Sequence, residues 1–125
     1  MILDTNALSA FIDGDSKVIS VIFRLARVAI PVIVAGEYRF GIAQSRHRSR
    51  MEQSFEEFLE SCSILIIDAT TTHHYAAIRL DLKRAGTPIP ANDVWVAALS
   101  RQHSMPVLSR DKHFDRVIGL KRNGW

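Results

Sequence analysis

The sequence is poor in the residues that build disulfide frameworks and membrane spans. Cys62 is its one cysteine, so no disulfide forms within the chain. The longest apolar runs cover residues 28–35 and 64–67, far short of the roughly 20 residues that a membrane-spanning helix needs. The chain opens without a basic segment followed by an apolar one, so we expect no signal peptide, no membrane partner and a reduced, cytoplasmic protein. We expect Cys62 to be a buried, small apolar residue.

Neither sign of charge dominates, and no segment is of low complexity. The 16 basic and 13 acidic residues give a net charge of +3, which permits a nucleic-acid partner but does not by itself indicate one. Apolar residues make up 47% of the 125 residues, which argues against a disordered chain and is enough for one hydrophobic core. We find no linker and no internal repeat, so the sequence predicts one domain over residues 1–125.

Short apolar runs that alternate with amphipathic segments predict an α/β protein. The predicted strands cover residues 1–3, 30–34, 64–67, 106–108 and, as a possible last strand, 117–120. The predicted helices cover residues 7–12, 16–28, 35–43, 51–61, 70–85, a segment that begins at 92–93, and a turn or short helix at 112–115. Pro31 indicates that the second strand begins there or lies near an edge. Continuous apolar strands are typical of a mostly parallel sheet covered on both faces, here with four or five strands in a three-layer α/β/α sandwich.

Four acidic residues follow the predicted strands or open the predicted helices. Asp4 comes directly after the first strand, Glu37 about one helical turn after the second, and Asp111 just after the strand at 106–108. Asp93 stands near the start of a helix. Because the carboxyl ends of parallel strands meet at one edge of a sheet, we expect these carboxylates to converge there. Such a cluster repels itself unless a cation neutralises it.

An oxygen-only cluster favours a hard divalent cation, Mg²⁺ or Mn²⁺. Zn²⁺ is less favoured, because no histidine or cysteine is grouped at ligand spacing. Each acid also has a simpler role open to it: Asp93 as a helix cap, Asp111 as a turn residue and Glu37 as a solvated side chain. Their joint placement after successive strands favours the metal site.

The four acids lie in four motifs that occur in a fixed order. These are Leu3-Asp4-Thr5-Asn6, Glu37 within a helix that follows an apolar strand, residues 89–98 around Asn92-Asp93, and residues 108–114 around Ser109-Arg110-Asp111. With these motifs the whole chain resembles the PIN-domain ribonucleases, in particular the VapC-like toxins of type II toxin–antitoxin pairs. Ser109 stands where threonine is common in that family, and it keeps the hydroxyl.

The resemblance implies a PIN-like fold that hydrolyses RNA phosphodiester bonds to a 5′-phosphate and a 3′-hydroxyl. One or two Mg²⁺ ions, or Mn²⁺ in their place, are then held mainly by Asp4, Asp93 and Asp111. Glu37 orients the attacking water or completes a second metal position. These four acids are the expected catalytic residues.

Other polar residues near the motifs are expected to support the cluster or the substrate. Thr5, Asn6 and Ser109 are polar enough to hold carboxylates or waters in place. Asp115 is a further acid that we expect to be a turn residue or a peripheral contributor. Arginines outside the cluster are expected to contact RNA phosphates, those of a basic loop at residues 46–50 above all. The RNA-contact candidates are Arg46, Arg48, Arg50 and Arg110.

By resemblance the partners are RNA, a second copy of the chain in a homodimer, and a cognate antitoxin that blocks the acidic pocket. Three other readings compete with this one. A phosphohydrolase that uses a covalent aspartate needs a second aspartate where Asn6 stands, and a phospho-accepting receiver domain needs an acidic pair where Asp4 stands alone. The third alternative is a catalytically silent PIN module that binds RNA or a protein partner, and a test of metal-dependent RNA cleavage separates it from an enzyme.

Overall fold

A five-stranded sheet runs through the centre of the computed structural model, which describes all 125 residues. Its spatial order is β3-β2-β1-β4-β5, and every neighbouring pair is parallel. The strands are short: β1 (Ile2–Leu3), β2 (Ala29–Pro31), β3 (Ser63–Leu65), β4 (Val107–Leu108) and β5 (Arg122–Asn123). The predicted α/β fold with a mostly parallel sheet of four or five strands is confirmed.

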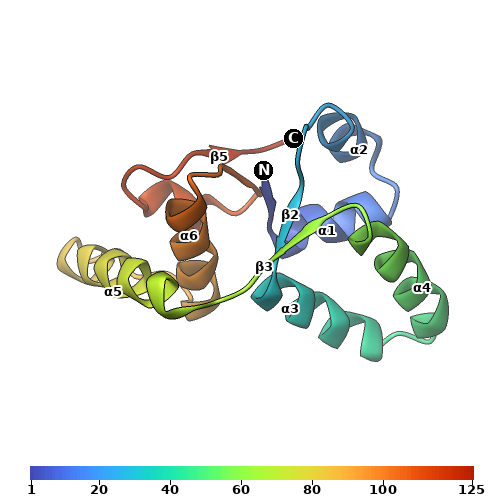
Figure 1. Cartoon of the computed structure of the whole chain (residues 1–125), viewed down its shortest axis with the longest axis horizontal. Coiled ribbons are helices and arrows are strands. Elements are labelled where there is room, and N and C mark those ends of the chain that lie inside the picture. Colours follow the sequence, from blue (N-terminus) through green and yellow to red (C-terminus); the bar gives the residue numbers. More distant parts are fainter.

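Helices flank the sheet, with α5 and α6 on one side and α1 to α4 on the other (Figure 1). The helices are α1 (Thr5–Ile12), α2 (Ser16–Ile22), α3 (Val32–Ala43), α4 (Arg48–Leu59), α5 (Ala69–Arg84) and α6 (Ala91–His103), with a 3₁₀ helix, η1, at Lys112–Arg116. None of them combines the length and the apolar character needed to cross a membrane.

The two strands that carry the first and fourth motifs lie in the deepest part of the core. Ile2 and Leu3 of β1 and Val107 and Leu108 of β4 have no exposed surface. Full burial of such a side chain contributes roughly 1.5–3 kcal/mol to folding. The strand ends that deliver the acids therefore rest on a rigid base, although each strand has only two residues.

The second predicted strand was placed too far along the chain. β2 ends at Pro31, and Val32 already begins α3. The β-branched run continues as a helix because Val34, Tyr38 and Ile42 are buried at a spacing of four residues, which is a helical period. Pro31 is the N-cap of α3 and β2 lies inside the sheet, so its prediction as a strand start or edge marker is wrong.

Both ends of the sheet also differ from the prediction. The strand predicted at 117–120 is absent, and β5 lies at Arg122–Asn123, in a segment with no apolar pattern; backbone pairing with β4 forms it. β3 lies at the edge of the sheet and is only partly buried: Leu65 is 5% exposed, whereas Ile64 is 44% exposed. Cys62, which precedes β3, is half-buried.

Two helix boundaries moved for local reasons. α2 ends at Ile22 rather than near 28, because the chain must return to place Ala29 beside Ile2 in the sheet. α5 is capped by Asp68, whose side chain accepts a hydrogen bond from the backbone of Thr71 in a capping box. At its other end Gly86 has φ +69°, the left-handed conformation expected of the residue that ends a helix.

β1 lies at the centre of the sheet, at the point where the order in which strands are added changes side. From β1 the chain adds β2 and β3 on one side, and then adds β4 and β5 on the other. In open parallel sheets a crevice forms beyond the carboxyl ends of the strands at this point. Because β1 and β4 are parallel neighbours, the residues that follow them meet at this end of the sheet.

Candidate active site

Asp4 is fixed at the carboxyl end of β1. It is only 6% exposed, and its backbone N–H donates to the carbonyl of Leu108 at 3.1 Å, which holds it to β4. Its Oδ2 accepts hydrogen bonds from the Ser109 hydroxyl at 2.8 Å and from the Asn6 amide at 2.9 Å. Asp4 is thus the buried carboxylate that the sequence predicted, and two polar side chains hold it.

Ser109 links the segments that follow β1 and β4. Its buried hydroxyl donates to Asp4 and also accepts from the Asn6 amide at 3.0 Å and from the backbone N–H of Asp111 at 2.9 Å. Asn6 in turn accepts from the backbone N–H of Arg110 at 3.1 Å. Every hydrogen-bonding position of the serine hydroxyl is used, so this network sets the position of the chain leading into Asp111.

Asp93 and Asp111 face each other across a histidine. Nδ1 of His113 lies 3.2 Å from Oδ2 of Asp93 and 3.1 Å from Oδ1 of Asp111. These three ligand atoms all lie within 4.8 Å of one another. Asp93 belongs to the first turn of α6, while Asp111 caps η1 by accepting a hydrogen bond from the backbone N–H of His113.

Glu37 projects from the second turn of α3 and is held at both oxygens. One oxygen accepts a hydrogen bond from the Thr5 hydroxyl at 2.5 Å, and the other accepts from the Asn92 amide at 2.5 Å. The carboxylate is therefore anchored to α1 and α6. Each oxygen still has a free acceptor position that a water can use.

The pKa values report how closely the acids converge. Burial raises the pKa of Asp4 despite the hydrogen bond from Ser109, and the charges of Glu37 and Asp111 raise it further. Burial also raises the pKa of Asp93 to about 6, and the charges of Asp4 and Asp111 act in the same direction. The sequence prediction that these acids gather at one end of the sheet is met in the structure.

This donor set fits a divalent cation. The donor atoms of Asp93, Asp111 and His113 lie within 4.8 Å of one another, and the charge of Asp4 is near enough to raise the pKa of Asp93. The charge of Glu37 likewise raises the pKa of Asp4, so a positive ion among these groups would be stabilised. Carboxylate oxygens suit Mg²⁺ and Mn²⁺. No histidine is grouped at ligand spacing in the sequence, so none was assigned to the site; in the structure the ring of His113 faces both Asp93 and Asp111.

Three of the arginines predicted to contact RNA stand together where α4 begins, and Arg110 belongs to a different segment, after β4. Arg46 stands in the turn after α3, while Arg48 and Arg50 belong to α4, so the predicted basic loop is partly helix. Arginine is a good helix former, so this polar segment extends the helix. The turn between α3 and α4 lies at the end of α3 away from the sheet (Figure 1). Arg110 is 55% exposed, lies 3.6 Å from Asp15 and stacks on Trp125 at 4.3 Å.

Two residues of the site had no assigned role in the sequence. Asn92 precedes Asp93, and its position at the start of α6 brings it to Glu37. His113 follows Asp111 by two residues, and the 3₁₀ turn bends its ring back over the acids. Both residues could have been proposed as site residues from the sequence, because each is a polar or metal-binding side chain close to a motif acid. Asp115 pairs with Arg122 at 2.7 Å and is not part of the cluster.

The chain is similar to known proteins over most of its length. The family model for the PIN domain matches residues 1–120. The chain is 27% identical to ribonuclease VapC2 of Haemophilus influenzae over 100 residues, which cover 79% of this chain and 76% of that protein. It is 26% identical to the tRNA(fMet)-specific endonuclease VapC of Shigella flexneri over 126 residues, 98% of this chain and 96% of that one. The crystal structure of DNA-bound VapBC from Salmonella typhimurium matches with a TM-score of 0.90 at 27% identity, covering 99% of this chain and 96% of that chain. Since the family model matches nearly the whole chain, this protein belongs to the PIN-domain family.

Proposed function

We propose that this protein is a metal-dependent endoribonuclease and the toxin of a toxin–antitoxin pair. The observation that carries the proposal is the convergence of Asp4, Glu37, Asp93 and Asp111 at the point where the sheet reverses, with hydrogen bonds holding Asp4 and Glu37 in place. The names of the similar proteins support it, since they are ribonucleases and one acts on a tRNA. The proposed domain is the whole chain, residues 1–125.

The acidic side chains have different roles in hydrolysis. Asp4, Asp93 and Asp111 would hold a divalent cation, Mg²⁺ or Mn²⁺, and that ion would supply Lewis-acid chemistry for activating water and stabilising the attacked phosphate. Glu37 keeps free acceptor positions while Thr5 and Asn92 hold it, so it orients the attacking water. Burial around Asp4 lowers the local dielectric, which strengthens these charge interactions.

Metal removal tests the enzymatic proposal. With labelled single-stranded and structured RNAs, the purified protein is expected to cleave in the presence of Mg²⁺ or Mn²⁺ and to lose cleavage when EDTA is added. Excess Mn²⁺ should then restore it, and the products should carry 5′-phosphates. Cleavage that continues unchanged in EDTA would contradict the proposal. RNA binding without cleavage under every metal condition would support the silent-module alternative.

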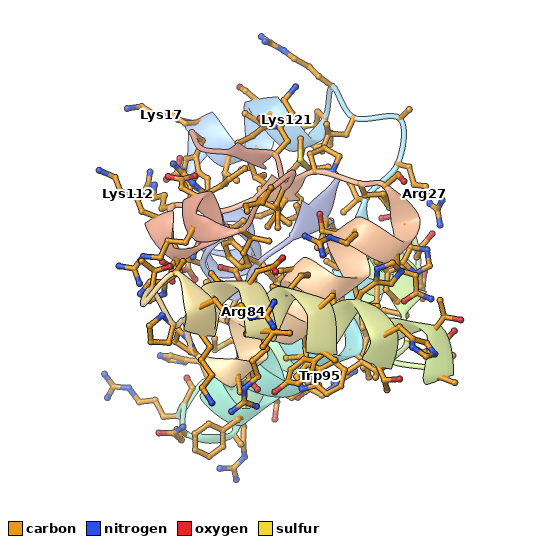
Figure 2. The ribbon with its side chains drawn as sticks, turned by 90° about the vertical axis from the view of Figure 1, so that its left-hand side faces the viewer. Lys17, Arg27, Arg84, Trp95, Lys112 and Lys121 are labelled. Atoms are coloured by element: carbon orange, nitrogen blue, oxygen red, sulfur yellow. The ribbon has the colours of Figure 1, made fainter.

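Basic side chains near the crevice suit an RNA backbone. Lys112 follows Asp111 directly, and Arg110 precedes it. Lys17 of α2 and Lys112 extend into solvent from the same side of the molecule (Figure 2). Phosphate contacts of this kind contribute affinity without sequence preference, and accessible bases are found in single strands and loops. We therefore favour single-stranded or loop RNA as the substrate.

An antitoxin partner has an apolar surface available to it. Phe23 after α2 is 79% exposed and Phe40 of α3 is 71% exposed, values that are unusual for such large apolar side chains. The ring of Phe23 packs on Phe11 at 6.5 Å, which in turn packs on Phe58 at 4.4 Å. A partner that covers Phe23 would bury an apolar area that continues through Phe11 to Phe58.

Substitution of Phe23 tests this surface. If a small antitoxin is encoded beside its gene, the wild-type chain co-expressed with that protein is expected to co-purify with it. Phe23→Asp should weaken the complex at least about 10-fold, because an aromatic anchor at an interface typically contributes more than 1 kcal/mol. Ile118→Asp is the matched control, since Ile118 is 76% exposed in the segment after η1, away from this cluster. Equal weakening by both variants would argue against the Phe23 surface. The homodimer expected by resemblance stays a prediction.

A further inference from the structure

We propose that His113 is itself a ligand of the divalent cation at this site, and that it makes the site prefer a transition-metal ion such as Mn²⁺ over Mg²⁺. This inference rests on the proposed metal-dependent function. It adds a nitrogen donor to a cluster that the four motif acids alone would make purely of oxygen, and it changes which ion the site selects.

The first support is the place of the ring. The 3₁₀ helix η1 begins directly after Asp111, and its backbone holds the Asp111 carboxylate through the N–H of His113 at 2.8 Å. The next residue, Phe114, is fully buried and anchors this turn in the core. The ring of His113 is therefore held over the crevice by the same turn that places Asp111.

The second support is the spacing of the donor atoms. Six ligands at about 2.1 Å from an ion stand about 3.0 Å from their nearest neighbours. Nδ1 of His113 lies 3.2 Å from Oδ2 of Asp93 and 3.1 Å from Oδ1 of Asp111. These separations are those of adjacent ligands around one ion, so binding requires little rearrangement.

The simpler role for His113 is an ion pair with the two acids. Both contacts, however, involve the same ring atom, Nδ1, and no side chain contacts Nε2. One N–H shared between two carboxylates is a poor hydrogen bond to each. If one cation lies between the three side chains, the Nδ1 lone pair and an oxygen of each carboxylate can all bind it. Each group then has a full partner, which the shared hydrogen bond does not give.

A nitrogen ligand has a predictable effect on metal choice. Mg²⁺ is bound by oxygen ligands and keeps several waters. Imidazole nitrogen is a ligand for first-row transition metals, and among these Mn²⁺ is the ion that also suits carboxylate oxygens. The site is therefore expected to bind Mn²⁺ more tightly than Mg²⁺, by a margin that depends on His113.

Metal binding by the whole chain tests this without RNA. Pulsed electron paramagnetic resonance of the Mn²⁺-loaded wild-type protein is expected to show coupling to a histidine nitrogen, and His113→Ala should remove that coupling. In calorimetric titrations His113→Ala should weaken Mn²⁺ binding at least about 10-fold, since even a supporting residue around a metal typically contributes 10–100-fold. Mg²⁺ binding should change much less. His73→Ala is the matched control, since His73 is exposed on α5.

Each result decides between distinct outcomes. Mn²⁺ binding without nitrogen coupling in the wild-type protein, or equal weakening of Mn²⁺ and Mg²⁺ in His113→Ala, overturns the role of His113 and leaves the proposed ribonuclease intact. Nitrogen coupling in a protein that never cleaves RNA supports His113 and overturns the ribonuclease. The wild-type spectrum needs no variant, so a His113→Ala protein that failed to fold would not prevent the decision.

Discussion

Asp4→Asn is expected to reduce metal-dependent RNA cleavage by more than about 100-fold, because loss of a metal ligand exceeds the 10–100-fold effect typical of residues around the ligands. The substitution removes one negative charge and keeps the shape of the side chain. Its amide oxygen can still accept the hydrogen bonds from Ser109 and Asn6, so the link between the ends of β1 and β4 is retained. The expected result is a folded protein without activity, measured by cleavage of labelled RNA in Mg²⁺ or Mn²⁺.

Asp81→Asn is the matched control for Asp4→Asn. Asp81 is exposed on α5, has no ion pair or side-chain hydrogen bond, and loses the same charge. Its cleavage should equal that of the wild-type protein, and both variants should show cooperative thermal unfolding. Substantial metal-dependent cleavage by purified Asp4→Asn would mean that Asp4 does not hold the cation, and the proposed mechanism would then be wrong.

The positions of Asp4 and Asp111 were predictable because they come just after apolar strands, and parallel strands all end at the same edge of the sheet. A buried apolar run followed at once by Asp4, and another followed by Ser109 and Asp111, are local patterns. Parallel pairing then brings the two ends together, since β1 and β4 are neighbours. The reversal of the sheet at β1 follows from its strand order, and it explains why the crevice opens there.

The features that the sequence missed depend on tertiary contacts. β5 has two polar residues and no apolar pattern, and only its backbone bonds to β4 define it. α3 begins in a β-branched run because a helix places Val34, Tyr38 and Ile42 on one face, where all three are buried in the core. His113 reaches Asp93 across 20 residues of sequence, through a 3₁₀ turn that no periodicity announces. Short strands and long-range side-chain contacts of this kind leave almost no pattern in the local sequence from which they could be predicted.

Asp93→Asn is expected to stabilise the metal-free protein at neutral pH, although it should also abolish activity. Burial raises the pKa of Asp93 from 3.8 to about 6, which means that folding makes its ionisation less favourable. Between those two pH values the folded protein binds a proton that the unfolded chain does not, so this group makes the protein less stable as pH rises. A shift of that size corresponds to about 3 kcal/mol at pH 7.5 as an upper value, at about 1.4 kcal/mol per pH unit.

Urea denaturation in EDTA measures this effect. At pH 7.5 the Asp93→Asn variant should be more stable than the wild-type protein by about 1–3 kcal/mol, and the difference should shrink as the pH falls through 6 and vanish near 4. Asp68→Asn is the control of opposite sign, because the backbone hydrogen bond from Thr71 lowers the pKa of Asp68. That variant should lose stability at pH 7.5 and approach the wild-type protein only as the pH falls into the acid range.

Adding a cation should remove or reverse the stability advantage of Asp93→Asn over the wild-type protein. A ligand that binds the folded state stabilises it by about 2.7 kcal/mol at 100 times its dissociation constant. Wild-type protein in saturating Mn²⁺ should gain this at pH 7.5, while the Asp93→Asn variant, which lacks a ligand, should gain little. Burial, together with the charges of Asp4 and Asp111, makes the ionised Asp93 unfavourable without a metal, and both effects favour a bound cation. A wild-type protein as stable in EDTA as in Mn²⁺, with Asp93→Asn no more stable than either, would show that the site is built for its own hydrogen bonds and not for a metal.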